Sequence, residues 1–117
     1  DSLNGDRRTN TLTGGAGNDI FSFTTPGHID TITDFNVAND TIELENSVFT
    51  VLNTPGALAP DQFRIGAQAV DPNDFIIYNS TTGVLIYDAN GSGAGGVVQI
   101  AQIGSGLALT NADIVVI

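Results

Sequence analysis

The residues best suited to chemistry lie in one glycine-rich segment, in which glycines precede a carboxylate at fixed spacing. Residues 14–22 read Gly-Gly-Ala-Gly-Asn-Asp-Ile-Phe-Ser and fit the nonapeptide pattern G-G-x-G-x-D-x-U-x, where U is a large apolar residue. Glycine permits the left-handed backbone that turns carbonyl groups inward, and the aspartate adds a carboxylate, so the segment offers hard oxygen ligands. Calcium is the ion that such ligands favour. The expected ligand residues are Gly14, Gly15, Ala16, Gly17 and Asp19.

A nine-residue period extends this motif towards the N-terminus, because Gly5 lies one period before Gly14. The apolar anchors of the period are Leu3, Leu12 and Phe21. A glycine-rich repeat this short predicts a parallel β-roll. In the earlier copy, other residues replace the second glycine, the third glycine and the aspartate, so we expect it to keep the coil without a full ligand set. These replacements are Asp6, Arg8 and Asn10.

Composition excludes several classes of function. The 117 residues suffice for one domain, and 13 acidic against 3 basic residues give a net charge of −10, which repels nucleic acid and anionic membrane surfaces. The absence of cysteine and the single histidine exclude disulfides, thiolate chemistry and a zinc site of the usual ligands. No apolar run is long enough for a membrane span, and no N-terminal signal peptide is expected.

Beyond the nonapeptide, apolar and polar residues alternate as in β-strands. The predicted strands are residues 30–35, 41–44, 75–78, 84–87 and 97–103. Turn residues at 79–83 and 88–96 predict two consecutive antiparallel hairpins, with one short helical turn within 53–63 and another capped by residues 110–113. The expected fold class is all-β: the end of a parallel calcium β-roll (1–25) continuing into a sandwich-like cap (26–117), with little helix, as one structural domain.

Blocks along nearly the whole chain are similar to those of one protein family. They are residues 12–21, Asp-Thr-Ile-Thr-Asp-Phe at 30–35, Asn-Asp-Thr-Ile-Glu-Leu at 39–44, Tyr-Asp-Ala-Asn-Gly at 87–91 and Ala-Asp-Ile-Val-Val-Ile at 112–117. The sequence thereby resembles the C-terminal region of RTX, or haemolysin-type calcium-binding, proteins, such as the serralysin-type metalloproteases. It carries one intact nonapeptide where family members usually carry several, so we expect one or two ions.

The resemblance implies further ligands and a route out of the cell. In the family, the D-x-I-x-D-F block and the following N-D-x-I supply carboxylates, which correspond here to Asp34 and Asp40, with Asp30 a weaker candidate. The resemblance also implies bacterial type I export to the extracellular medium, the N-terminal domains of a parent protein as partners, and an uncleaved C-terminal signal. An acid-plus-apolar terminus of this kind also fits a last core strand. The signal residues would be Asp113, Ile114, Val115, Val116 and Ile117.

Other candidate sites have simpler explanations. Residues 88–93 resemble the first half of an EF-hand loop, but position twelve is Gln99 and strands flank the segment, so a hairpin turn is favoured and Asp88 is a weak ligand candidate. His28 lacks a catalytic partner and is expected in a loop. Glu43 and Glu45 alternate with apolar residues, which indicates a solvated strand face rather than a glycosidase pair.

The sequence contains no H-E-x-x-H, G-x-S-x-G or phosphate-loop motif, so we do not expect an enzyme. The expected function is a noncatalytic calcium-binding module that supports type I secretion and calcium-driven folding of a larger extracellular protein. The chain would then be a C-terminal piece of that parent. The alternative is a carbohydrate- or surface-binding module of a secreted adhesin or polysaccharide-modifying enzyme, in which Tyr78 or Tyr87 contacts the sugar.

Overall fold

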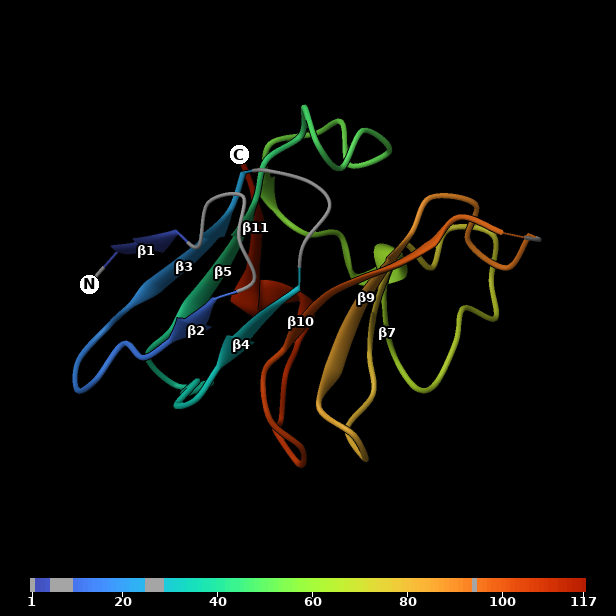
Figure 1. Ribbon diagram of the computed structural model, residues 1–117. Helices are drawn as coiled ribbons and strands as arrows, with labels where there is room; N and C mark the ends of the chain where they lie inside the picture. The colour runs from blue at the N-terminus through green and yellow to red at the C-terminus, as the bar shows by residue number, and fades with distance from the viewer. Residues whose placement is uncertain (1, 5–9, 25–28, 94) are drawn as a thin grey trace.

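The computed structural model describes residues 2–4, 10–24, 29–93 and 95–117 (Figure 1). This part of the chain is all-β, with strands joined by turns and two short 3-10 helices. The strands are β1 (Ser2–Asn4), β2 (Thr11–Leu12), β3 (Ile20–Phe23), β4 (Asp30–Ile32), β5 (Thr41–Leu44), β6 (Gly56–Ala57), β7 (Phe63–Ile65), β8 (Ile76–Tyr78), β9 (Val84–Asp88), β10 (Val97–Gln102) and β11 (Ile114–Val116), and the helices are η1 (Pro60–Gln62) and η2 (Asn111–Asp113). Within these ranges no helix is long and apolar enough to cross a membrane.

The first five strands alternate between two sheets. One sheet has the order β1-β3-β5-β11-β6 and the other the order β2-β4-β10-β9-β8-β7. In the first sheet β1, β3 and β5 pair in parallel, and in the second β2 pairs in parallel with β4. Leu3 is therefore level with Phe21 in one sheet, while Leu12 is level with Ile32 in the other. Successive apolar anchors, nine residues apart in the sequence, therefore lie on strands of alternate sheets.

The C-terminal residues return to the same two sheets after a long intervening segment. Strand β10 pairs in parallel with β4, and β11 pairs in parallel with β5, so residues 97–116 form one further coil on the same two sheets. The intervening residues 45–96, which we call the cap, supply β6 to β9. Alternation between the sheets continues as far as β5, beyond the expected boundary between residues 25 and 26, and that boundary itself falls among residues outside the described ranges.

Most of the predicted elements are confirmed. Strand β9 pairs in antiparallel fashion with both β8 and β10, which gives the two predicted hairpins, and the two 3-10 helices lie where short helical turns were expected. Strand β4 ends at Ile32 and not at residue 35 as predicted, and Thr33 and Asp34 belong to the loop that follows. Strands β6 and β7 were not predicted.

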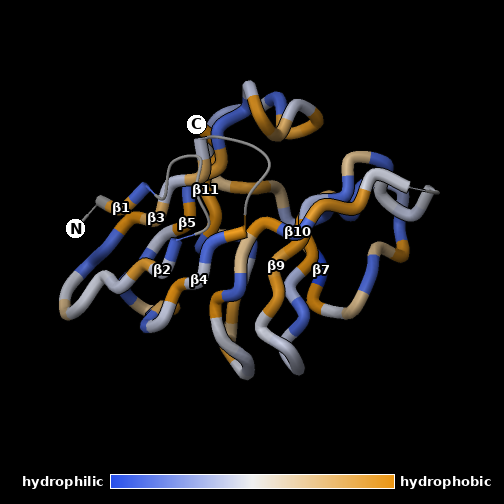
Figure 2. Tube along the Cα trace, viewed as in Figure 1, coloured by the Kyte–Doolittle hydropathy of each residue, from blue (hydrophilic) through white to orange (hydrophobic). Residues whose placement is uncertain are grey.

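Apolar side chains from both sheets meet in one core. In β3 and β5 every second side chain is buried, and Phe21, Ile42 and Leu44 have no exposed surface. The rings of Phe21 and Phe35 lie 6.0 Å apart between centroids. Figure 2 shows the apolar residues concentrated on the strands and the polar residues in the turns. Burial of this kind contributes roughly 1.5–3 kcal/mol for each large side chain, and it fixes the positions of the loops between the strands.

Candidate calcium site

Two loops at the same end of neighbouring coils lie against each other. Residues 13–19 connect β2 to β3, and residues 33–40 connect β4 to β5; because β2 pairs with β4 and β3 with β5, the second loop follows the first in the stack. The backbone N–H groups of Gly14 and Gly15 donate to Oδ1 and Oδ2 of Asp34, at 2.9 and 2.7 Å. The structure therefore brings the nonapeptide glycines and Asp34 together, as expected.

Asp40 makes the second connection between the loops. Its Oδ1 accepts the backbone N–H of Asp19 at 3.0 Å, and its Oδ2 accepts that of Asn36 at 2.8 Å. Asp40 is 4% exposed and Asp34 is half-buried. A carboxylate has about four acceptor positions, so these hydrogen bonds leave each aspartate able to bind a cation as well. We call the two loops together the loop junction.

The first loop folds closely around Asp19. This aspartate is buried, and a Cβ atom at Gly14 would lie 2.3 Å from its Oδ2, so only glycine leaves room for the carboxylate there. Gly15 and Gly17 have φ of 80° and 92°, the left-handed region in which glycine is strongly favoured. The pattern of glycines in the sequence thus follows from the shape of a cradle around one carboxylate. Ala16 lies exposed at its turn.

The chemistry of these residues fits a hard divalent cation. The loop junction contains the carboxylates of Asp19, Asp34 and Asp40, and its loops contain backbone carbonyl groups; oxygen atoms of these kinds are the ligands that Ca²⁺ prefers. Among the described residues no three acidic or histidine side chains converge as a cluster. A calcium ion here would therefore need backbone carbonyls in addition to carboxylates, as the nonapeptide motif predicts.

Asp30 and Asp88 lie away from the loop junction. Asp30 is fully buried at the opposite end of β4, where its Oδ1 accepts the backbone N–H of Asn10 at 2.8 Å. Asp88 ends β9 in the cap, and its Oδ1 accepts the N–H of Asn90 at 3.1 Å within the turn to β10. The hairpin-turn interpretation of residues 88–93 is therefore confirmed.

The third loop of the stack carries no carboxylate at the equivalent positions. Ala101 pairs with Asp30 and Ile114 with Ile42, and counting onward from these pairs aligns Ser105 with Asp34 and Ala112 with Asp40. The last coil therefore has no aspartate at the two positions from which Asp34 and Asp40 bind the preceding loop. Sequence reasoning missed this change because residues 45–96 separate the aligned segments.

The C-terminal residues form a core strand. Strand β11 lies between β5 and β6, and Ile114 and Val116 are 0% and 3% exposed. Asp113 ends η2, where its Oδ2 accepts the backbone N–H of Thr110 at 2.9 Å. Val115 and Ile117 are half-buried. The last-core-strand interpretation of the terminus is confirmed.

The tyrosines named for sugar binding are inside the protein, so that assignment is wrong. Tyr78 has no exposed surface and Tyr87 is 7% exposed. The hydroxyl of Tyr78 donates to the carbonyl of Gly104, and that of Tyr87 accepts the N–H of Val51 at 3.3 Å. Their inward position follows from strand alternation, which puts both rings on the core face.

The remaining candidates give no acid-base pair. Glu43 accepts a hydrogen bond from the hydroxyl of Ser22 at 2.9 Å, while Glu45 accepts the N–H of Ser47 at 3.3 Å. Each glutamate thus has its own local partner. His28, and the Asp6 and Arg8 of the earlier repeat, lie outside the described residues.

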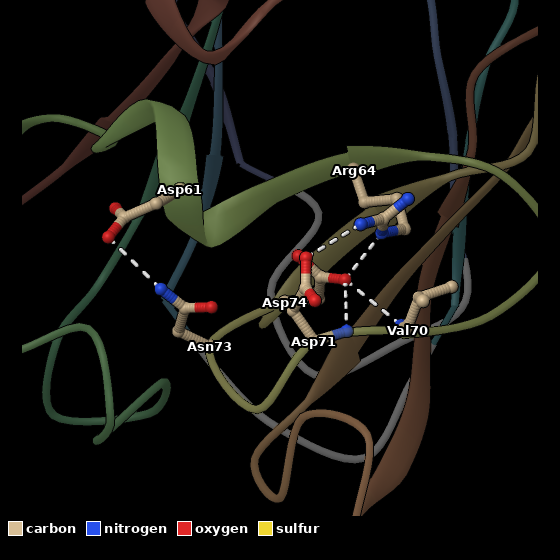
Figure 3. Close-up of polar contacts among 6 residues, drawn as sticks. All are labelled: Asp61, Arg64, Val70, Asp71, Asn73 and Asp74. Carbon is tan, nitrogen blue, oxygen red and sulfur yellow. Dashed lines mark hydrogen bonds and ion pairs between the residues drawn. The ribbon is translucent and has the colours of Figure 1, made fainter.

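A charged cluster in the cap was not predicted from the sequence. Arg64 on β7 contacts Asp74 through Nε and Asp71 through a nitrogen 2.8 Å from Oδ2, and the N–H groups of Val70 and Asp71 also donate to Asp74 (Figure 3). Burial opposes ionisation of Asp74, but these hydrogen bonds and the guanidinium outweigh it and hold the pKa of Asp74 below its usual value. The cluster fastens the loop after β7, because all its donors surround one buried carboxylate.

Comparison of the chain with protein-family models, with curated proteins and with solved structures gave no match.

Proposed function

We propose that this chain is a noncatalytic calcium-binding module: the end of a parallel β-roll with its cap, which supports calcium-driven folding and type I secretion of a larger extracellular protein. The observation that carries the proposal is the loop junction, where Gly14, Gly15 and Asp19 meet Asp34 and Asp40. The alternation of parallel strands between two sheets supports the β-roll part.

Electrostatics explains why folding would depend on calcium. With a net charge of −10 the chain repels itself on compaction, and buried carboxylates such as Asp19 and Asp40 add to that cost. An ion bound only by the folded state stabilises it by RT ln(1 + [L]/Kd), about 2.7 kcal/mol at a hundredfold excess over Kd. That is a large share of the roughly 5–15 kcal/mol by which domains are stable, so calcium would decide whether the domain is folded.

The proposal places one calcium ion at the loop junction. The third loop supports this number, because neutral Ser105 and Ala112 occupy the positions of Asp34 and Asp40. A second ion between the second and third loops would lack carboxylates at these two positions. The earlier repeat has Asn10 where the intact nonapeptide has Asp19, so it lacks the carboxylate at that position.

The same C-terminal residues would serve secretion and folding in succession. In the unfolded chain, residues 113–117 are available to an exporter as a signal. In the folded domain Ile114 and Val116 are core residues of a strand between β5 and β6. Calcium outside the cell would therefore bury the signal residues in the folded core once export is complete.

The calcium part is tested by isothermal titration calorimetry with a charge-matched control. Asp19→Asn removes the buried carboxylate of the loop junction, whereas Asp61→Asn removes an exposed one in the cap, where Asp61 accepts a hydrogen bond from Asn73 at 3.0 Å. We expect Asp19→Asn to weaken calcium binding by roughly tenfold or more and Asp61→Asn to leave it unchanged. Equal effects would refute a specific site and leave only general charge attraction.

The secretion part is tested separately in a full-length parent. Removing residues 113–117 should abolish export, while the double substitution Ile114→Val and Val116→Ile should retain it, because the terminus stays apolar. Undiminished export of the truncated parent would refute this half of the proposal and leave calcium binding unaffected.

A further inference from the structure

The turn between β8 and β9 is hydrogen-bonded to the loop between β10 and β11. The N–H of Ile103 donates to the carbonyl of Gly83 at 2.8 Å, and the N–H of Gly106 donates to the carbonyl of Ser80, also at 2.8 Å. The approach is so close that a Cβ atom on Gly83 would lie 2.6 Å from the carbonyl carbon of Gly104. The cap and the last loop are thus in direct backbone contact, which we call the clasp.

The loops at this end of the coils form three layers. Residues 13–19 and 33–40 of the loop junction are the first and second layers, and the loop between β10 and β11 is the third. It connects β10 to β11, and those strands pair with β4 and β5, so it follows residues 33–40 as they follow residues 13–19. Between the first two layers, Asp34 and Asp40 accept backbone N–H groups. The third layer has Ser105 and Ala112 at these positions. The clasp therefore fastens a layer that has no aspartate at these two positions.

Tyr78 contributes a side chain with no exposed surface to the clasp. Its hydroxyl donates to the carbonyl of Gly104 and accepts the N–H of Leu107 at 3.1 Å, so one phenol fixes the loop at two points. Leu107 in turn packs against the core that contains Phe35, a residue of the second layer. The third layer is thus tied to the phenol on one side, and on the other it shares the hydrophobic core and the strand pairs β10–β4 and β11–β5 with the second layer.

We propose that Tyr78 is a positioning residue for the calcium site: its hydroxyl holds the third layer in place, and that layer holds residues 33–40 in the conformation that binds the ion. This inference rests on the proposed calcium site. Tyr78 itself contacts none of the proposed ligands. It raises calcium affinity by reducing the number of conformations that the second loop adopts before the ion binds.

Tyr87 provides a matched control in the adjacent strand. It is also a buried tyrosine, but its hydroxyl bonds to Val51 in the loop after β5 rather than to the clasp. Tyr78→Phe and Tyr87→Phe each remove one buried hydroxyl and leave an aromatic ring in the core. A general loss of stability would therefore affect both variants in a similar way.

The experiment measures calcium dissociation constants by calorimetry, together with amide hydrogen exchange at Gly14, Gly15 and Asp19, whose N–H groups donate to Asp34 and Asp40. We expect Tyr78→Phe to raise the calcium dissociation constant roughly threefold or more and to speed exchange at these amides, and Tyr87→Phe to do neither. Equal effects in the two variants, or none in Tyr78→Phe, would overturn the inference.

The failure of the proposed function is distinguishable from failure of this inference. If the unmodified chain does not bind calcium, the calcium site falls, and with it the role of Tyr78 towards the ion. If the unmodified chain binds calcium and the two variants behave alike, only the positioning role falls. Should Tyr78→Phe not fold, Gln102→Ala replaces it, because Gln102 Nε2 donates to the carbonyl of Thr82 at the surface of the same clasp. The same weakening is expected of Gln102→Ala, and unchanged affinity would overturn the inference.

Discussion

Replacing Gly14 with alanine tests the cradle around Asp19 with the smallest possible change. The backbone of Gly14 is not in the left-handed region, so alanine introduces no φ strain there. The added Cβ would instead lie 2.3, 2.7 and 2.9 Å from Oδ2, Cγ and Cβ of Asp19. Either the carboxylate or the loop must move, and the change therefore acts directly at the proposed site.

The size of the effect follows from the packing. Forcing one extra methyl group into a filled site costs about 1–3 kcal/mol, and glycine to alanine recovers about 0.4–1 kcal/mol by restricting the unfolded chain. We expect Gly14→Ala to lose about 1.3 kcal/mol of stability in chelator, which is the difference between the midpoints of these two ranges. Displacing a ligand carboxylate should also weaken calcium binding by roughly tenfold.

Gly66→Ala is the matched control, because the nearest atom to its added Cβ is 3.9 Å away, which is ordinary contact. This variant should gain about 0.4–1 kcal/mol of stability and keep its calcium affinity. The assay is urea unfolding followed by circular dichroism, in chelator and in calcium. If Gly14→Ala behaves as Gly66→Ala does in both conditions, the cradle does not hold Asp19 as a ligand and the reasoning is refuted.

Three further predictions concern the cap and the terminus. Because the folded-state pKa of Asp74 is lowered, its stabilisation is present above about pH 5 and is lost as pH falls below about 4; Asp74→Asn should flatten this part of a stability-against-pH curve, and an unchanged slope would contradict it. Removing residues 113–117 deletes buried Ile114 and Val116, worth about 3–6 kcal/mol together, so the β signal in circular dichroism should be largely lost. Gly91→Ala places a Cβ 2.0 Å from a carbonyl oxygen of the loop after β7, at φ +57°, and should lower stability by about 2 kcal/mol or more in urea unfolding; a neutral result would count against the packing of this loop.

The sequence predicted those features that depend on local pattern. Gly14, Gly15 and Gly17 are needed because a loop must close around Asp19, and that need appears directly as a glycine spacing. The hairpin strands were found because short runs of apolar, strand-favouring residues at 76–78 and 84–87 are separated by turn residues. Asp34 and Asp40 were expected as calcium ligands from a resemblance; the structure shows that Asp34 accepts two backbone N–H groups of the preceding loop and Asp40 accepts one.

What the sequence did not predict depends on contacts between distant segments. The last coil is completed by β10 and β11 only after residues 45–96, and no local pattern announces that β10 pairs with β4 or β11 with β5. The clusters around Arg64 and Tyr78 join residues that are level in space but separated along the chain. Tyr78 was misread as a surface residue because aromatic residues suit both sugar sites and cores, and only the register decides between them.

The central claim is that calcium binding drives folding. Its most direct test is a calcium titration of the chain, freed of calcium beforehand by a chelator and followed by circular dichroism, with magnesium as the control. A site formed by the loop junction predicts a cooperative rise of β signal with calcium that magnesium does not reproduce, and a midpoint shifted to higher calcium in Asp19→Asn. A chain that is equally folded in chelator and in calcium, with the same thermal midpoint in both, would contradict the claim that calcium binding drives folding.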